Sequence, residues 1–406
     1  MTFKIACIGE PLAEISSNIH GFSVAYGGDT MNTAIYAARC PGTSVSYMTA
    51  VGTDTLSDGA VALLEAEAID TRYVRRDPNR QIGIYSITND AAGERNFHYW
   101  RSDSAARCIA SEDDPMLNAF ADFDVVYLSG ITLAVLSQAA RDRLWLALQK
   151  ADTSVAFDSN YRETLWQSPK LAQLEISRFW QITDIALPTI EDEAALFGDS
   201  SATETINRLR AANARSGALK CGADGPIPIA NIATLPPFEK AEIVVDTTGA
   251  GDSFNGSYLG LLAQDMPEEL RLQGAHSVAK SVIGHKGAIP PKDVGRPTQR
   301  MGMLIGLKPE TKAEYIKLHA DVWPKVLDRL SQSNITNYSI FLREPENLMF
   351  SYWEYTGDDF AADDAAIAAD PVTQKWWSIC GPMQDPLATR TDGDWWADMR
   401  EVFHLD

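Results

Sequence analysis

A carboxylate and a turn of small residues stand together in the run 245–256, a combination suited to phosphoryl transfer. The turn is formed by Gly249, Ala250 and Gly251. The apolar run 243–245 predicts a short strand before the turn, and 254–262 predicts an amphipathic helix after it. Unpaired N–H groups at such a helix start can hold negative charge. Asp252 would lie beside that charge and could accept a proton from an attacking hydroxyl. The alternative is that Asp252 and Ser253 only cap the helix.

The composition favours two domains and excludes several kinds of partner. At 406 residues the chain exceeds most single compact domains. Its net charge of −20 argues against non-specific binding to nucleic acid or anionic membranes, so an anionic substrate would need a local basic site. Five scattered cysteines without CxxC spacing predict reduced thiols in a cytoplasmic protein. We expect neither a leader segment nor a membrane span.

A second glycine turn follows the first predicted strand, 3–8, and leads into a helix that reaches residue 39. Gly28 lies in this turn, with Asp29 after it and Asn32 one helical turn further on. The two polar side chains could face a polyol and bind its hydroxyl groups. The alternative is that Asp29 only caps the helix.

Two alternating runs, 82–88 and 95–101, predict a β-hairpin. Their period of two would place Phe97, Tyr99 and Arg101 on one face. Aromatic residues in strands usually serve packing. An arginine beside a tyrosine could instead bind a substrate carboxylate.

Polar residues also gather after the predicted strand that begins at 155. Asp158, Asn160 and Arg162 follow it, at the edge where doubly wound sheets bind ligands. Asp158 and Asn160 have the alternative role of forming turns. Arg162 is a second candidate for binding a substrate carboxylate or a phosphate.

Strands alternate with helices as far as about residue 293, which predicts an α/β domain with a mostly parallel sheet. A strand and glycine loop over 218–225 and a helix and loop over 275–289 complete the pattern. His285 in the second loop is more typical of a pocket wall or surface position than of a proton shuttle.

The run 246–252, DTTGAGD, resembles the signature of the PfkB (ribokinase-like) carbohydrate kinases. This resemblance implies a three-layer sandwich with a β lid, ATP and Mg²⁺ as cofactors, and a monovalent cation as a further candidate. It also implies Asp252 as the general base and residues 249–251 as the anion hole. The run 28–33 is similar to the sugar-binding turn of 2-keto-3-deoxygluconate kinases.

The same resemblance assigns the remaining kinase residues. The implied substrate contacts are Gly28, Asp29, Asn32, Tyr85, Tyr99, Arg101 and Arg162. The implied nucleotide contacts are Asn160, Lys220, Gly222, Gly225, Gly249, Gly251 and His285. Many relatives carry a magnesium-associated Asn-x-x-Glu where this chain has Thr189 and Asp192, so Asp192 is the metal candidate.

A proline-rich polar stretch, 290–300, predicts a break between domains. We expect a kinase domain over 1–293, a linker over 294–300 and a second domain over 301–406. The second domain holds six of the ten tryptophans. Its predicted strands, 303–307, 337–342, 348–355 and 401–405, and its helices, the first over 311–330, follow a βαββαβ order typical of a ferredoxin-like sandwich.

Tyr315 and His319 share one face of the first helix of this domain, and Pro324 should end or kink that helix. A single histidine on such a face is usually structural. Together with Tyr338 and the Trp376–Trp377 pair, however, it would suit a sugar pocket, because aromatic rings stack on sugar faces.

The C-terminal segments look like L-rhamnose mutarotase from end to end, in a dimeric α/β-barrel type of fold. Mutarotation needs one acid and one base to open and reclose a hemiacetal. The resemblance implies His319 as acid/base, Tyr315 and Tyr338 as assisting groups, and Trp376 and Trp377 as sugar contacts. His404 stands where relatives often have Tyr. The relatives are dimers, which implies a homodimer here.

The sequence therefore predicts a bifunctional cytoplasmic enzyme that acts on a small sugar acid and a sugar. The kinase alternative is another sugar kinase of the same fold, such as a ribokinase or fructokinase. The alternative for the second domain is a non-catalytic module for dimerisation or ligand sensing.

Overall fold

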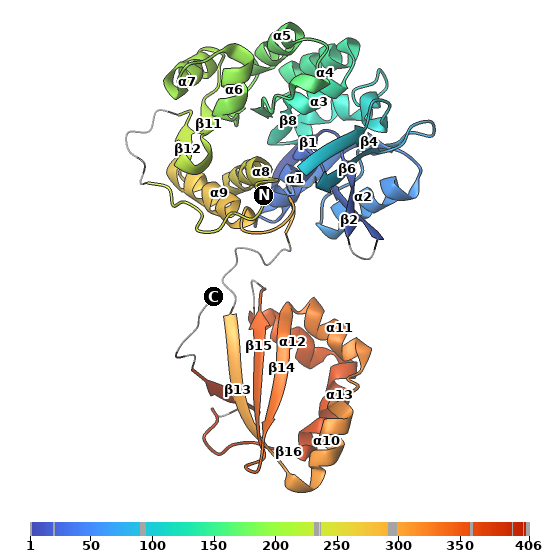
Figure 1. Ribbon diagram of the computed structural model, residues 1–406, viewed down its shortest axis with the longest axis vertical. Coiled ribbons are helices and arrows are strands. Elements are labelled where there is room, and N and C mark those ends of the chain that lie inside the picture. Colours follow the sequence, from blue (N-terminus) through green and yellow to red (C-terminus); the bar gives the residue numbers. More distant parts are fainter. Residues whose placement is uncertain are drawn as a thin grey trace. The chain divides into compact units, whose positions relative to one another are not determined.

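The computed structural model describes residues 2–18, 21–89, 95–230, 235, 237–290, 299–357, 360–391, 393–400 and 402. The chain forms two compact units, Met1–Lys292 and Asp293–Asp406, coloured blue to yellow and orange to red in Figure 1. The predicted linker, 294–300, lies largely outside the described residues. None of the helices in the described ranges is long and apolar enough to cross a membrane.

An eight-stranded sheet forms the centre of the N-terminal unit, in the order β12-β11-β10-β9-β8-β1-β4-β5. The strands are β1 (Phe3–Ile8), β4 (Thr43–Val51), β5 (Val74–Arg76), β8 (Val125–Ser129), β9 (Ser154–Asp158), β10 (Ile185–Ala186), β11 (Ser216–Lys220) and β12 (Pro226–Pro228). Neighbouring strands pair in parallel, except β12, which is antiparallel to β11. Every residue of β8 is buried, as in strands covered on both faces.

Two layers of helices enclose this sheet (Figure 1). They are α1 (Asp29–Ala38), α2 (Thr55–Ala66), α3 (Gly130–Val135), α4 (Gln138–Lys150), α5 (Pro169–Trp180), α6 (Ile190–Phe197), α7 (Ala202–Ala211), α8 (Ala250–Leu262) and α9 (Glu268–Val282). Alternate residues of β1 enter two cores. Ile5 packs in the core formed with α1, α8 and α9, whereas Ile8 packs in the core formed with α3, α4 and α5. The predicted three-layer α/β sandwich is confirmed.

A separate four-stranded sheet, in the order β3-β2-β6-β7, forms the lid. Its strands are β2 (Leu12–Asn18), β3 (Gly21–Gly27), β6 (Gly83–Asn89) and β7 (Arg95–Trp100). The predicted hairpin is confirmed, because β6 and β7 pair antiparallel with Tyr85 opposite Tyr99. The connecting residues 90–94 and the side chain of Phe97 lie outside the described part of the chain.

The strand predicted over 243–245 is wrong. The segment is irregular, and Ile243 is 69% exposed. The end of the segment is held by two backbone hydrogen bonds, because the amides of Val245 and Asp246 both donate to the Ile283 carbonyl oxygen. The edge strand β12 has only three residues, two of them prolines without an N–H donor, so the sheet offers little pairing for a further strand.

The C-terminal unit has an antiparallel sheet in the order β14-β15-β13-β16, with β17 also paired to β13. The strands are β13 (Gln299–Leu307), β14 (Ile335–Arg343), β15 (Leu348–Tyr355), β16 (Gln384–Asp385) and β17 (Ala397–Met399). Its helices are α10 (Lys312–His319), α11 (Pro324–Gln332), α12 (Phe360–Ala369) and α13 (Pro371–Cys380). This arrangement confirms the predicted ferredoxin-like α+β fold.

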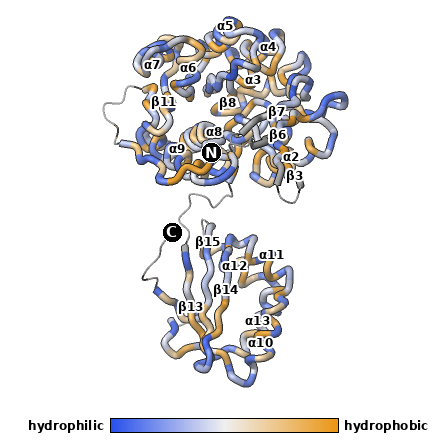
Figure 2. The backbone as a smooth tube through the Cα atoms, in the orientation of Figure 1, coloured by the Kyte–Doolittle hydropathy of each residue, from blue (hydrophilic) through white to orange (hydrophobic). Residues whose placement is uncertain are grey.

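In the described part of this unit, helices and sheet enclose two hydrophobic cores. The larger, around Ile305 and Tyr315, lies near the hydrophobic end of β13, which Figure 2 shows in orange, and the smaller lies around Trp353 and Tyr355. The predicted first helix, 311–330, is interrupted at the expected place, because Pro324 occupies the first turn of α11. The predicted last strand, 401–405, and His404 within it lie almost wholly outside the described residues. The last described strand is β17.

Candidate active sites

The glycine turn opens the first turn of α8 to the site. Gly249 has a left-handed φ of 78°, and a Cβ added there would lie 2.8 Å from Ala288. Only glycine fits this position without strain. No side chain of the described residues caps α8. The Ala250 amide donates to the Thr247 carbonyl oxygen at 3.3 Å, so the amides of Gly249, Gly251 and Asp252 are the ones available to an anion.

Close packing of α1 against α8 brings Asn32 to Asp252. A Cβ at Gly256 would lie 2.3 Å from the Thr33 carbonyl oxygen, so glycine allows the two helices to approach. Asn32 Nδ2 then donates to Asp252 Oδ2 at 2.7 Å. Burial, followed by the charge of Asp29, raises the pKa of Asp252 to about 7. A carboxylate with this pKa suits general-base catalysis at neutral pH.

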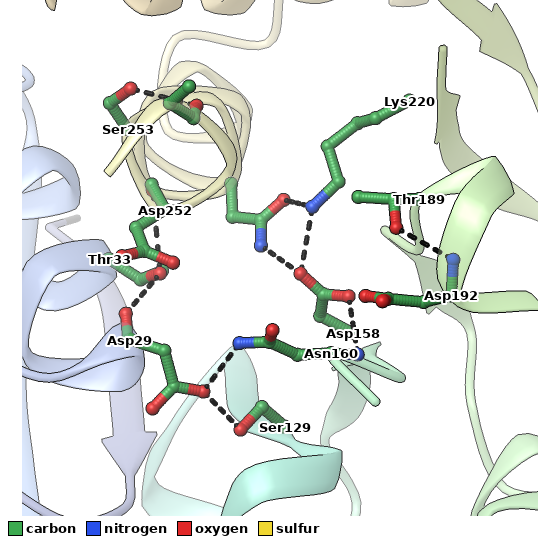
Figure 3. Close-up of polar contacts among 12 residues, drawn as sticks. Asp29, Thr33, Ser129, Asp158, Asn160, Thr189, Asp192, Lys220, Asp252 and Ser253 are labelled. Carbon is green, nitrogen blue, oxygen red and sulfur yellow. Dashed lines mark hydrogen bonds and ion pairs between the residues drawn. The ribbon is translucent and has the colours of Figure 1, made fainter. Parts of the chain in front are cut away.

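Asp29 lies in the same cluster, as Figure 3 shows. Its Oδ2 accepts from Asn160 Nδ2 at 3.0 Å and from the Ser129 hydroxyl. Gly28, and not Asp29, occupies the N-cap of α1, so the capping alternative for Asp29 is wrong. Gly28 has a φ of 132°, and a Cβ there would lie 2.4 Å from the Glu10 carbonyl oxygen.

Lys220 lies under the glycine turn in a second polar group. Its Nζ donates to Asp158 Oδ2 at 2.8 Å and to Asn255 Oδ1 at 2.9 Å. A Cβ added at Gly251 would lie 3.5 Å from this ammonium group. Asn255 was not predicted as a site residue, although its position three residues after Asp252 on α8 was a usable signal.

Arg162 and Asp192 pair with each other. Arg162 NH1 lies 3.2 Å from Asp192 Oδ1, and Thr189 Oγ1 caps the Asp192 amide. Burial raises the pKa of Asp192. Within the described residues, no group of three or more His, Cys, Asp or Glu side chains is arranged to hold a metal ion.

Arg101 makes a different ion pair, with buried Glu10, which follows β1 by two residues. Each arginine thus pairs with a different carboxylate of the protein, and the binding of a substrate carboxylate by Arg101 and Arg162 stays a prediction. On the lid, Tyr85 donates to Glu14 and stacks on Tyr99 with ring centroids 5.7 Å apart. Glu10 and Glu14 escaped prediction, because nothing in their local pattern distinguishes them from exposed acidic residues.

The predicted nucleotide loops have the backbone that their glycines allow. Gly222 and Gly225 have φ values of 54° and 86°, and a Cβ on Gly225 would lie 2.5 Å from Phe238. Asp246 links the signature to the second loop, because Oδ2 accepts from the Gly287 amide at 2.8 Å. His285 is exposed, and its Nδ1 lies 3.0 Å from the Ser281 carbonyl oxygen.

The C-terminal unit has a cluster of aromatic rings around Tyr315. His319 stacks on Tyr315 with centroids 4.0 Å apart and meets Trp376 edge-on at 5.3 Å. Trp323, which the sequence had not suggested as a site residue, also meets Trp376 edge-on, with ring centroids 5.3 Å apart. Tyr315 and Trp376 are buried in the core of this unit.

Adjacent residues on a helix point about 100° apart, and this separates the tryptophan pair. Trp377 is 47% exposed, whereas Trp376 is 5% exposed. Tyr338 is partly exposed but close enough to Tyr315 to influence its ionisation. Burial lowers the pKa of His319, which keeps the ring neutral at physiological pH.

Both sites can now be compared with known proteins. The N-terminal fold is that of the ribokinase-like sugar kinases: a 2-dehydro-3-deoxygluconokinase from Thermotoga maritima superposes with a TM-score of 0.63 at 23% identity, covering 71% of this chain and 95% of that one. The family model of the pfkB carbohydrate kinases matches residues 2–294, and the chain belongs to this family. The L-rhamnose mutarotase model matches residues 300–405.

One sequence relative and one further solved structure are also similar to the N-terminal unit. A 2-dehydro-3-deoxygluconokinase from Dickeya dadantii is 38% identical over 302 residues, covering 71% of this chain and 97% of the relative. A Vibrio cholerae fructokinase variant, solved with fructose, ADP and potassium, superposes with a TM-score of 0.62 at 20% identity, covering 72% of this chain and 95% of that one.

Proposed function

We propose that the N-terminal unit phosphorylates 2-keto-3-deoxygluconate, or a related keto-deoxy sugar acid, with ATP. The observation that carries this proposal is the Asp252 carboxyl, with a pKa of about 7, in the uncapped first turn of α8. In the reaction, Asp252 accepts the proton of the sugar hydroxyl as that oxygen attacks phosphorus. The open amides of Gly249 and Gly251 stabilise the negative charge on the transferred group.

The relatives support an acid substrate, and the site has groups that suit one. The Dickeya relative, named for its action on a keto-deoxy sugar acid, matches nearly its whole length. Arg101 is already paired with Glu10, but a guanidinium has five N–H donors and can serve a second carboxylate. Asp29, Asn32, Tyr85 and Tyr99 would bind the hydroxyl groups. Arg162 is paired with Asp192, and Asp192 is close enough to Asp158 to feel its charge. This position suits Arg162 to binding a phosphate group.

We assign the nucleotide to the loops around Lys220 and His285. Lys220, Asn160 and the glycines at 222, 225, 249 and 251 supply the cradle. Magnesium would be held mainly by the nucleotide phosphates and would neutralise their charge, because it needs few protein ligands. Asp192 is the carboxylate that the sequence motif suggests for it. The potassium and ADP of the Vibrio fructokinase support a nucleotide and a monovalent cation here.

The test is a substrate panel for the full chain. ADP release would be measured with 2-keto-3-deoxygluconate, its C4 epimer, fructose and ribose. We expect kcat/KM to favour an acid over the neutral sugars by at least about 100-fold, because a site built for a polar group rejects substrates that lack it. Comparable values for fructose or ribose would replace this proposal with the alternative sugar kinase.

We also propose that the C-terminal unit interconverts the anomers of L-rhamnose or a related sugar. Supporting this, the neutral ring of His319 stacks on the Tyr315 ring and meets Trp376 edge-on, and the exposed Tyr338 lies near Tyr315. The exposed Trp377 would add a further sugar contact. Saturation-transfer NMR of the sugar anomers would measure exchange in wild type, His319→Ala and Lys317→Ala, the last an exposed control on the same helix. Equal exchange in the first two would favour a non-catalytic dimerisation or sensing module.

We infer further that the chain forms a homodimer through this unit. Large aromatic side chains remain exposed on it, among them Phe341 at 58% and Trp395 at 51%. Light scattering of the full chain and of Phe341→Glu would test the pairing. All five cysteines are free thiols, which supports a reducing cytoplasmic location.

A further inference from the structure

A buried amide stands behind Tyr315 that none of the recognised motifs includes. Gln384, the first residue of β16, is 8% exposed. Its Nε2 lies 3.2 Å from Tyr315 Oη, and its Oε1 lies 2.6 Å from Trp395 Nε1. The three side chains thus form a short relay that ends at the tyrosine hydroxyl.

The direction of each hydrogen bond in this relay follows from chemistry. An indole N–H can only donate, so the oxygen of the Gln384 amide must face Trp395 and the NH₂ group must face Tyr315. The Tyr315 oxygen therefore accepts a bond from Gln384. Its own O–H, which cannot point back at a donor, is directed elsewhere.

The same reasoning fixes the tautomer of His319. Its Nδ1 lies 3.0 Å from the Tyr315 main-chain carbonyl oxygen, which can only accept. Nδ1 therefore carries the ring proton, and in the neutral ring Nε2 keeps its lone pair. Tyr315 is thus set as a proton donor and His319 as a proton acceptor.

We propose that Gln384 is a positioning residue that fixes Tyr315 as the acid, and leaves His319 Nε2 as the base, of the mutarotation. This rests on the function proposed for the C-terminal unit. As the ring C–O bond breaks, Tyr315 gives its proton to the ring oxygen and His319 takes the proton of the anomeric hydroxyl. Reclosure on the other face of the carbonyl returns both protons, so no charge or atom is lost.

The ionisable groups around the relay are compatible with these roles. Besides His319 on its own helix, Tyr315 faces Tyr338 of β14 and Cys380 of α13. Burial raises the pKa of Tyr315 above its ordinary range and raises the pKa of Cys380 to about 11, so both stay protonated. Asp385, next to Gln384, is exposed.

The decisive variant is Gln384→Glu, which preserves shape but changes hydrogen-bond direction. An ionised carboxylate accepts from both Trp395 and Tyr315, and so turns the Tyr315 O–H toward position 384, where it cannot serve the sugar. We expect exchange at pH 8 to fall by about 10-fold or more, since a positioned proton donor contributes roughly 10²- to 10⁴-fold. Once protonated, the new carboxyl can donate to Tyr315 and restore the original pattern.

The readout is the ratio of variant to wild-type exchange rate between pH 8 and 5.5. This ratio should rise as pH falls, because the introduced carboxyl becomes protonated and can again donate to Tyr315. The titration of His319 affects both proteins and so cancels in the ratio. A ratio that is constant with pH would mean that Gln384 only fills space, and would overturn the proposal. Kinase activity of the same chain checks that the protein is intact.

Trp395→Phe provides an independent variant, since this half-exposed side chain tolerates loss of the indole N–H. It should lower exchange by a few fold without a pH-dependent ratio, and an unchanged rate would count against the relay. If wild type exchanges no sugar anomer, the proposed function fails. In that case, the direction of the hydrogen bond between residue 384 and Tyr315 is read from the ¹³Cζ NMR shift of Tyr315 in wild type and Q384E. Identical shifts at pH 8 would refute the proposed role of Gln384.

Discussion

Burial acts on the two candidate bases of this protein in opposite senses. It raises the pKa of Asp252 to about 7 and lowers the pKa of His319 below the usual histidine value. The physical cause is the same, because a site with little water disfavours whichever form carries charge. A carboxylate must be charged to act as a base, whereas an imidazole must be neutral. Burial therefore narrows the pH range in which Asp252 can act as a base and widens the pH range in which His319 can.

The two sites also differ in how they are held. Asp252 is positioned by Asn32 and by the close contact of α1 with α8, and its neighbours are mostly charged or polar. His319 is positioned by rings, with Tyr315 and Trp376 on two sides and one backbone carbonyl. The first site thus depends on electrostatics and the second on packing.

The largest expected effect is that of Asp252→Asn on the kinase. The amide keeps the shape but cannot accept the sugar proton, so kcat should fall by about 10²- to 10⁴-fold. Mutarotation by the same molecules should be unchanged, because its base lies in the other unit. Coupled ADP assays and NMR exchange on one preparation would measure both. Nucleotide turnover equal to that of wild type would show that Asp252 is not the base of the kinase reaction.

Packing should decide the stability of the second site. Trp376→Ala removes a ring that is 5% exposed and touches Trp323 and His319, which should cost about 3–5 kcal/mol of unfolding free energy. Trp377→Ala, at the neighbouring 47% exposed position, is the matched control and should cost about 1 kcal/mol or less. Urea unfolding followed by circular dichroism measures both. Equal costs would contradict a site held by aromatic packing.

The pH dependence should separate the two activities. Asp252 is active when ionised, so kinase kcat/KM should be full above its pKa of about 7 and decline as pH falls through it. At pH 6 the decline should be roughly tenfold. Mutarotation should persist to a lower pH than the kinase reaction, because burial lowers the pKa of His319 and keeps its ring neutral. Parallel profiles measured on the same chain would remove the proposed contrast.

Much of both folds could be predicted because the relevant signals are local. The run 246–252 and the turn at Gly28 each lie within one short segment, and Gly249 and Gly28 have backbone angles and close contacts that exclude other residues. Pro324 likewise breaks its helix for a reason intrinsic to proline. Features of this kind need no knowledge of what packs against them.

The rest depended on partners distant in the sequence. Nothing near Arg101 reveals that Glu10 will neutralise it, because the pair spans 91 positions. The run 243–245 has strand composition, but whether it forms a strand depends on the edge left by β12. Gln384 meets Tyr315 across 69 positions, so its role emerges only when β16 packs beside α10.

The smallest expected effect tests the hydrogen bond from Asn32, which lowers the pKa of Asp252. Asn32 donates to the ionised carboxylate and lowers its pKa against the effect of burial. Asn32→Ala should therefore move the midpoint of the kinase pH profile upward by about one unit, given the strength of hydrogen bonds to charged groups. Thr33→Val is the control, because Thr33 bonds to the Asp252 main-chain oxygen at 3.4 Å and not to its carboxylate. Its midpoint should stay at about 7, and a profile unmoved in Asn32→Ala as well would show that burial and Asp29 alone set the pKa.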